Sequence, residues 1–291
     1  MCAGALGPPM LVQILNGLVY GGLLYIVSVG LVLIFGLRRI VNFAHGSLFM
    51  IGAYVGFSVA AIGGYWGGIL IAAVVLALIG AALDVSILRP LQREDPIVTV
   101  LVTFGLLLVL EDFAQFVWGK DFLRMPVPAV FAGSVPIFGE SFPVYRLVVI
   151  ATAALVGLGL TLWLRMSKIG LYVRASNADP LTTAMQGVNT DHVSIVVVAL
   201  GAALAGLSGT VSAPLLALSP SMGSYILIES FIVVVVGGLG SFAGAFVAAI
   251  VIGQLHNFGL VFVPWGATMF PFVLMVAVLI WRPTGIAGSH V

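Results

Sequence analysis

The side chains of this sequence best suited to chemistry are ionisable groups inside apolar segments. Glu229 is the clearest case, because it lies in the run YILIESFIVVVV without a basic neighbour. A charged group at the centre of a bilayer costs at least about 2.5 to 3.5 kcal/mol, so this carboxyl group must face protein or water. Glu229 is therefore a candidate for lining a transport pathway. The alternative is a structural hydrogen bond to another helix.

The other acidic residues of apolar segments have simpler interpretations. Asp84 lies near the cytoplasmic end of its expected helix, five residues before Arg89, and we expect its side chain either to snorkel to the membrane surface or to pair locally. Glu111 and Asp112 lie close to Lys120 in the sequence. This spacing favours a charge cluster at the opposite membrane surface.

Two polar or glycine-rich interruptions break the apolar runs, at residues 42–46 (NFAHG) and 237–241 (GGLGS). They fall in opposite halves of the chain, and broken segments in corresponding halves usually point to a transport pathway between structural repeats. Because the first interruption follows a pair of arginines, we expect it to shape the cytoplasmic mouth of a pathway. The pathway candidates in these interruptions are Asn42, His45, Gly237, Gly238 and Gly240.

Several kinds of chemistry are not expected. His45 and His256 lack the spacing of metal ligands, and a single cysteine, Cys2, excludes an intrachain disulfide. No nucleotide-binding GxxxxGKS or GxxxxGKT motif, HExxH motif or nucleophile elbow occurs. We therefore expect no enzyme activity, no cofactor and no metal in this chain; if ATP drives it, the ATPase is a separate polypeptide. A net charge of +1 does not indicate a nucleic-acid partner.

The elements that position these residues must be membrane helices. Of the 291 residues, 62% are hydrophobic and only 7% are charged, whereas soluble domains have roughly 25% charged residues. The apolar residues come in long runs and do not alternate, which disfavours a β-barrel. The composition predicts an all-α polytopic membrane protein, with residues 1–291 forming a single transmembrane domain.

Runs near the roughly 20 residues needed to span a bilayer predict eight or nine transmembrane helices. The segments after residue 220 are short and closely spaced, so a re-entrant segment is the alternative to a ninth crossing. The expected segments are at about 10–36, 46–62, 67–88, 97–118, 147–164, 193–216, 225–239, 241–260 and 267–281.

The distribution of basic residues predicts the orientation. If the first helix runs inward, three basic residues fall outside and eight fall inside, and cytoplasmic loops are the ones enriched in Lys and Arg. The N-terminus is then external and the C-terminus cytoplasmic. Loop 165–192 is cytoplasmic, and loop 119–146, with four prolines, is an external, stiff and extended cover without helices. The eight inner residues are Arg38, Arg39, Arg89, Arg93, Arg165, Lys168, Arg174 and Arg282.

Loop 165–192 carries the signature of a short helix. Asn177 and Asp179 fit as caps, Pro180 fits the first helical position, and Gly187 fits the end. Because a helix of about two turns is not stable alone, it needs a surface to lie on. That surface belongs either to another protein, a motor subunit that pushes on the membrane domain, or to the chain's own transmembrane helices. The apolar stripe that would face it has the spacing i, i+3, i+4 and i+7: Leu181, Ala184, Met185 and Val188.

Several stretches resemble the permease subunits of branched-chain amino acid ABC importers of the Liv type, in particular the shorter of the two permease types. The first is VNFAHGSLFMIGAY at residues 41–54. Further matches are the residues from Arg174 through Asp191, the run GGLGSFAGAFVAAIVIG at 237–253, and the closing RPTGI at 282–286. Together these stretches span nearly the whole chain in the expected order.

The resemblance implies a transport mechanism in a bacterial inner membrane. Two related permeases would form the pathway, two cytoplasmic ATPases would bind ATP and Mg, and an external solute-binding protein would deliver the substrate. The helix from Pro180 to Gln186, capped by Asp179, would sit in a groove of the ATPase and transmit its motion. A branched-chain amino acid is the implied substrate. An apolar lining with few charges would also suit urea or a short amide.

A protein of a different class remains the alternative. An ion-coupled secondary transporter or channel that acts without an ATPase would use a buried ionisable group, and Glu229 is the candidate for it. A membrane scaffold that transports nothing is a third hypothesis. Broken glycine-rich segments would serve no purpose in such a scaffold.

Overall fold

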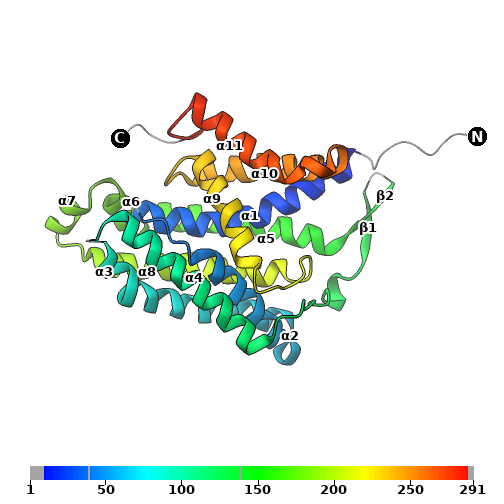
Figure 1. Cartoon of the computed structure of the whole chain (residues 1–291), viewed down its shortest axis with the longest axis horizontal. Helices are drawn as coiled ribbons and strands as arrows, with labels where there is room; N and C mark the ends of the chain where they lie inside the picture. Colours follow the sequence, from blue (N-terminus) through cyan, green and yellow to red (C-terminus); the bar gives the residue numbers. More distant parts are fainter. Residues whose placement is uncertain (1–9, 39, 93, 138, 288–291) are drawn as a thin grey trace, which may run out of the picture.

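Residues 10–38, 40–92, 94–137 and 139–287 are described by the computed structural model of the chain. Cys2, Arg39 and Arg93 lie outside these residues. Helices run along the long axis of the molecule, and a small β-hairpin lies at one end (Figure 1). We call that end the hairpin end. The opposite end carries the short helices α6 and α7, and we call it the α7 end.

Helices dominate the described residues, as the sequence predicts. Seven of these helices are long and apolar enough to cross a membrane, which confirms an all-α polytopic membrane protein. The longer helices are α1 (Met10–Arg38), α2 (His45–Leu83), α4 (Pro96–Trp118), α5 (Val144–Met166), α8 (Thr190–Ser212) and α10 (Phe242–Phe262). The shorter ones are α3 (Arg89–Leu91), α6 (Lys168–Ala178), α7 (Pro180–Met185), α9 (Met222–Gly237) and α11 (Phe270–Trp281). A π-helical turn, η1 (Asp84–Leu88), joins α2 to α3, and the 3₁₀ turns are η2 (Ala129–Phe131) and η3 (Pro264–Met269).

Helix α2 comprises two antiparallel segments. Its backbone leaves the helical region at Gly64, where φ is 72° and ψ is 169°. The chain folds back there, so that a side chain on Gly68 would begin 2.8 Å from the carbonyl oxygen of Gly56. The two segments expected at 46–62 and 67–88 are therefore present. With α2 counted twice and the 16-residue α9 added, the described residues hold nine apolar segments.

The centre of the molecule is the crossing of α1 and α8. Side chains added at Gly30 or Gly201 would lie 2.7 or 2.9 Å from the other residue's carbonyl oxygen, so the two backbones touch. The Ser208 hydroxyl of α8 donates a hydrogen bond to the Leu23 carbonyl of α1 at 3.3 Å. Earlier residues of α1 thus meet later residues of α8, and the helices are antiparallel. Small residues allow this approach, as is common between membrane helices.

Two helices begin against each other inside the bundle. His45, the first residue of α2, contacts the Val27 carbonyl near the middle of α1, with 3.0 Å between Nε2 and the oxygen. Residues 40–44 therefore fold back from the α7 end into the bundle. Helix α9 begins at the same depth, because a side chain on Gly46 would lie 2.2 Å from the Gly223 carbonyl oxygen.

The order of α1 and α2 is repeated by α8 and α9. In each pair a long helix precedes a helix that begins inside the bundle, and the long helices run in opposite directions. This is the pattern of an inverted repeat. The counterpart of residues 42–46 is therefore the segment before Met222. Residues 237–241 form instead the turn between α9 and α10, where Gly240 lies beside Gly36 at the α7 end.

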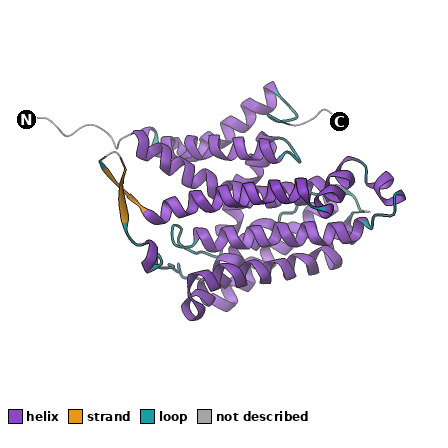
Figure 2. Cartoon of the chain, turned by 180° about the vertical axis from the view of Figure 1, so that it is seen from behind, coloured by secondary structure: helices purple, strands orange, loops and turns teal. Residues whose placement is uncertain are grey.

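The loop between α4 and α5 differs from the expected extended cover. It contains η2 and an antiparallel hairpin of β1 (Ser134–Ile137) and β2 (Glu140–Pro143), which Figure 2 shows in orange. Two residues join the strands, and the φ of 88° at Gly139 suits such a tight turn. Because both strands are edges, their prolines are tolerated. Helix α5 begins at Val144, inside the expected loop.

Candidate functional site

Helix α7 is capped as the sequence predicts. The Asp179 carboxylate accepts hydrogen bonds from the amides of Leu181 and Thr182 at 3.0 and 3.1 Å, and Pro180 occupies the first turn. Gly187 follows the helix with a φ of 83°, a value that favours glycine. Hydrogen bonds from the Thr182 hydroxyl and the two amides lower the pKa of Asp179 below its ordinary value.

The apolar stripe of α7 does not lie on the chain's own helices. Leu181 is 68% exposed and Met185 is 77% exposed; Ala184 is also exposed, and Val188 is half-buried. The buried residue of the helix is Thr183. An internal resting surface is therefore wrong for the three stripe residues within α7, and docking to another protein stays a prediction.

Helix α6, which connects α5 to α7, was not predicted. The Ser167 hydroxyl caps it by accepting a hydrogen bond from the Gly170 amide at 2.8 Å. Its buried residues are Gly170, Val173 and Ser176, at a spacing of three. Asn177, expected as a cap of α7, lies instead in the last turn of α6. The cap residue Ser167 and this spacing are the signals that would have revealed the helix.

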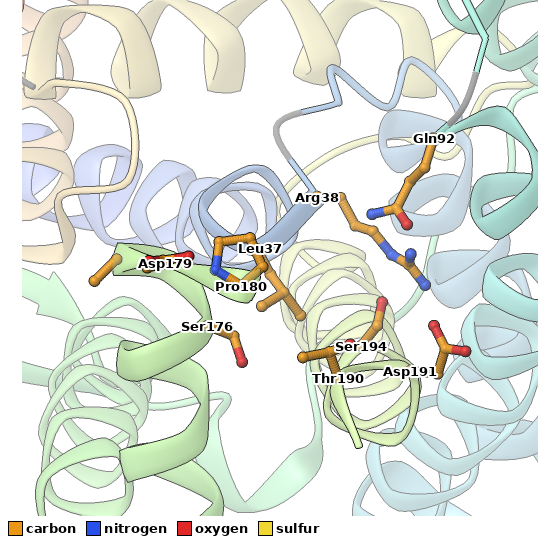
Figure 3. Close-up of a pocket in the computed structure, with 10 residues that line it drawn as sticks. Leu37, Arg38, Gln92, Ser176, Asp179, Pro180, Thr190, Asp191 and Ser194 are labelled. Atoms are coloured by element: carbon orange, nitrogen blue, oxygen red, sulfur yellow. The ribbon is translucent and has the colours of Figure 1, made fainter. Parts of the chain in front are cut away.

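A cavity of about 580 Å³ lies where α6, α7, the end of α1 and the start of α8 meet (Figure 3). Its lining includes Arg38, Ser176, Asp179, Asp191 and Ser194. In Figure 3 the Arg38 side chain points from the end of α1 toward the start of α8, where Ser194 and Asp191 lie. The end of α1, the start of α8 and the residues of α6 and α7 thus meet around one polar cavity.

A buried ion-pair network lies beside this cavity. Arg38 Nη2 contacts both carboxylate oxygens of Asp84, at 2.8 and 2.9 Å, and Arg38 Nε donates to Oδ1 at 3.1 Å. The Ser194 hydroxyl donates to the same oxygen at 3.0 Å. Arg89 lies 3.8 Å from Asp84 and 3.7 Å from Asp191. The network ties α1, η1, α3 and α8 together.

The local pairing expected for Asp84 is therefore only a minor part of its environment. Its principal partner is Arg38, which lies 46 residues earlier in the chain. The Asp84 side chain is 0% exposed and that of Arg38 is 3% exposed, so the pair is buried within the protein. Spacing along one helix cannot reveal a partner on another helix.

Asn42 and His45 lie inside the bundle, and their part in a cytoplasmic mouth stays a prediction. Both are buried. The Asn42 side chain accepts a hydrogen bond from the Ala44 amide at 3.1 Å, which shapes the turn into α2. The second ring nitrogen of His45, Nδ1, has no hydrogen-bond partner within the described residues. A role for these two residues in the pathway stays a prediction.

Glu229 makes the hydrogen bond to another helix that the sequence left open. The Tyr20 hydroxyl of α1 donates to its carboxylate. The Tyr20 ring stacks on the His256 ring of α10, with 4.3 Å between ring centroids and 18° between planes. All three side chains are half-buried. Whether Glu229 also lines the pathway stays a prediction.

Within the part of the chain that the structure describes, the remaining acidic and histidine side chains do not gather into a metal site. Glu111 accepts a hydrogen bond from the Ser224 hydroxyl of α9. None of the ion pairs within the described residues includes Lys120, so the charge cluster expected at the membrane surface stays a prediction. Across the same ranges, no group of three or more His, Cys, Asp or Glu side chains is placed to hold a metal ion.

Comparison with known proteins gives one family. Residues 13–279 match the family described as branched-chain amino acid transport system / permease component. The chain is 28% identical to the high-affinity branched-chain amino acid transport system permease protein BraD of Pseudomonas aeruginosa, over 95% of both chains. It is 26% identical to LivH of Escherichia coli, over 95% of this chain and 94% of that one. It is 26% identical to a probable LivH of Methanocaldococcus jannaschii, over 97% and 93%. No solved structure matches.

Proposed function

The chain belongs to the branched-chain amino acid transport permease family, and from this premise we propose that it is the transmembrane subunit of an ATP-driven importer. The proposed substrate is a branched-chain amino acid, with urea or a short amide as the alternative. In this proposal the chain itself catalyses no reaction and holds no cofactor. ATP and Mg are bound by separate cytoplasmic ATPase subunits, and the chain contributes the pathway through the membrane.

The exposed stripe of α7 is the observation that carries this proposal. Leu181 and Met185 extend from a short, well-capped helix without a surface of this chain beneath them. Burying a side chain of this size contributes about 1.5 to 3 kcal/mol. A groove on a partner that received both side chains would therefore hold α7 firmly enough to move it.

A movement of α7 would be transmitted into the bundle through contacts between helices. Helix α7 contacts α6 and the start of α8, and Ser194 of α8 shares the Asp84 carboxylate with Arg38 of α1. Helices α8 and α1 cross at the centre of the bundle. Motion of the ATPase would thus reach the place inside the bundle where α2 and α9 begin.

The remaining partners follow from the same proposal. A second, homologous permease completes the pathway, and a solute-binding protein delivers substrate at the hairpin end. The α7 end and the C-terminus face the cytoplasm, and the N-terminus lies outside the bacterial inner membrane. The gathering of basic residues around the α7 end supports this orientation, because cytoplasmic loops are rich in Lys and Arg.

The stripe provides the direct test of ATPase docking. We expect the double substitution of Leu181→Asp and Met185→Asp to abolish copurification with the ATPase and ATP-dependent uptake, while membrane insertion is unchanged. Gln186→Asp, a change at the exposed residue that directly follows α7 and lies off the stripe, is the matched control and should leave both intact. Normal copurification of the double variant would contradict the proposal.

An ion-coupled carrier is the second candidate, because Glu229 is an ionisable group within a membrane helix. Uptake in cells separates the two. Transport that survives deletion of the ATPase gene but is lost in Glu229→Gln would favour the carrier. Transport that stops without the ATPase supports the importer.

A further inference from the structure

Three side chains from three helices form a cluster on the flank of the bundle. The flank cluster consists of Glu229 of α9, Tyr20 of α1 and His256 of α10. Each residue lies at least six positions from either end of its helix, which is about 9 Å of helix length. The cluster is therefore at membrane depth.

A polar strip leads from the hairpin end to the flank cluster. Gln13, Asn16 and Tyr20 share one face of α1, at the spacing i, i+3 and i+7. Helix α10 extends the strip, because Asn257 Nδ2 donates to Gln13 Oε1 at 2.8 Å. Gln254 Nε2 donates to a backbone carbonyl of α1 at 2.9 Å. Polar groups, with Arg146 Nη1 of α5 donating a hydrogen bond to Asn16 Oδ1, thus line a track that ends at a carboxylate.

Only one oxygen of the Glu229 carboxylate has a hydrogen-bond partner within the described residues. Tyr20 donates to Oε2, and no hydrogen bond to Oε1 is found within the described residues. The side chain is half-buried and Oε1 is not among the buried unpartnered atoms, so this oxygen is accessible from the flank. An ionisable group in that position does not face lipid. The flank therefore borders water, a polar solute or another protein subunit.

The groups of the flank cluster suit a small organic cation. A carboxylate oxygen forms its strongest hydrogen bonds with charged donors such as an ammonium group. One face of the Tyr20 ring is covered by the stacked His256 ring, so the carboxylate oxygen is the group of the cluster that would attract a cation. A zwitterionic amino acid carries such an ammonium group, whereas urea and simple amides do not.

We propose that the flank cluster receives the ammonium group of a zwitterionic amino acid during its passage. Glu229 Oε1 accepts the ammonium hydrogen bond, Tyr20 holds the carboxylate in position, and His256 holds the Tyr20 ring. This assignment rests on the proposed function. It also narrows the substrate to amino acids.

Ligand binding tests the proposal without transport. Saturation-transfer NMR would be recorded on the purified full chain, with the subunits that copurify and without the solute-binding protein. The probes are leucine and 4-methylpentanoate, which is leucine without its ammonium group. We expect the leucine signal to fall by about tenfold in Glu229→Gln, as for the loss of one charged hydrogen bond, and the weak 4-methylpentanoate signal to stay unchanged.

Controls make this result specific. Glu111→Gln changes another half-buried membrane carboxyl group that is hydrogen-bonded by a hydroxyl, and it should keep the leucine signal. Glu229→Asp keeps the charge and should retain more binding than Glu229→Gln. An equal leucine signal in wild type and Glu229→Gln, or no leucine signal in wild type, would overturn the assignment.

Uptake into proteoliposomes separates this inference from the proposed function. We expect Glu229→Gln to lower ATP-driven leucine uptake by about tenfold, with Tyr20→Phe intermediate and copurification with the ATPase unchanged. ATP-dependent uptake that is unaffected by Glu229→Gln would contradict the role of the flank cluster but not the proposed function. Wild-type uptake that needs no ATP would contradict the proposed function.

Discussion

Arg38 and Asp84 form a buried ion pair, and its geometry determines what the pair contributes. Three hydrogen bonds from Arg38 and one from Ser194 satisfy the carboxylate. Removing one member of such a pair leaves the other charged and buried, whereas replacing both members by apolar residues is often neutral. The pair therefore matters more for how α1 and α8 are connected than for net stability.

We expect Asp84→Ala to lower the thermal stability of the detergent-solubilised protein by the equivalent of about 3 to 5 kcal/mol. Combining Arg38→Met with Asp84→Leu should restore most of that loss. Asp112→Ala, which changes an exposed carboxylate, is the matched control and should shift stability by less than about 0.5 kcal/mol. A double variant as unstable as Asp84→Ala would refute this account of the network.

The cap of α7 has a defined pH dependence. Because hydrogen bonds lower the pKa of Asp179 in the folded protein, its ionised form stabilises α7 above the unfolded value, and this contribution is lost as pH falls through the folded value. The cap is thus intact across neutral pH. Uptake should not vary between about pH 6 and 8 through this group.

Substitutions of Asp179 test the cap itself. Asp179→Ala should reduce ATP-coupled uptake by at least about twofold without changing membrane insertion, because the N-cap hydrogen bonds are lost. Asp179→Asn, which keeps a capping oxygen, is the control and should retain most of the uptake. Equal uptake in wild type and Asp179→Ala, at equal expression, would show that the cap plays no part in coupling.

At the scale of single residues, sequence reasoning found local chemistry and missed distant partners. The roles of Asp179 and Pro180 follow from neighbours within three positions, so spacing was enough to predict them. Asp84 and Glu229 needed partners from α1, which is more than 40 residues away in each case. An apolar run shows that such a carboxyl group needs a partner, but not which one.

At the scale of elements, the contact between the starts of α2 and α9 depends on the absence of side chains. Gly46 and Gly223 each lie where an added side chain would meet the other's backbone. Backbone atoms cannot move aside as the end of a flexible side chain can. The two helix starts therefore tolerate no larger residue at this point.

We expect Gly46→Ala to cost about 1 to 3 kcal/mol of stability, as overpacking typically does. Gly105→Ala in α4 is the matched control, because an added side chain there meets nothing within 4 Å. That variant should be neutral or slightly stabilised, since alanine favours helix more than glycine does. Thermal unfolding in detergent measures both. Equal behaviour of the two variants would contradict the tight contact.

Helix positions followed from the lengths of apolar runs, since one bilayer thickness fixes the length of each run. The positions of the irregular elements could not be predicted in this way. Helix α6 has a mixed composition and is stabilised by packing against α5 and α8. The β-hairpin was not predicted because its strands contain prolines, which usually argue against a strand. The polar residues before α2 interrupt the apolar run, but hydropathy does not reveal that these residues are buried inside the bundle.

At the scale of the whole molecule, orientation is the property that remains to be measured. In a Cys2→Ser background, we expect Gly133→Cys at the hairpin end to react with a membrane-impermeant maleimide on intact cells. Gln186→Cys at the α7 end should react only after permeabilisation. Both positions are exposed. The opposite labelling pattern would reverse the proposed direction of transport.

The class of the whole molecule was predictable because hydrophobicity sets it, and the family followed from stretches spread over the chain. The arrangement of the helices was not predictable in the same way. The repeat linking α1 and α2 to α8 and α9 is carried by backbone contacts between glycines, and glycine is too common in membrane helices to identify such contacts.

The exposed stripe on α7 has a consequence for how long the unassembled protein persists in the cell. A subunit inserted before its ATPase is made would present Leu181 and Met185 to chaperones and proteases as a sign of an orphan chain. Synthesis in matched amounts would be the simplest protection. The abundance of this chain should then rise and fall with that of whichever subunit covers the stripe.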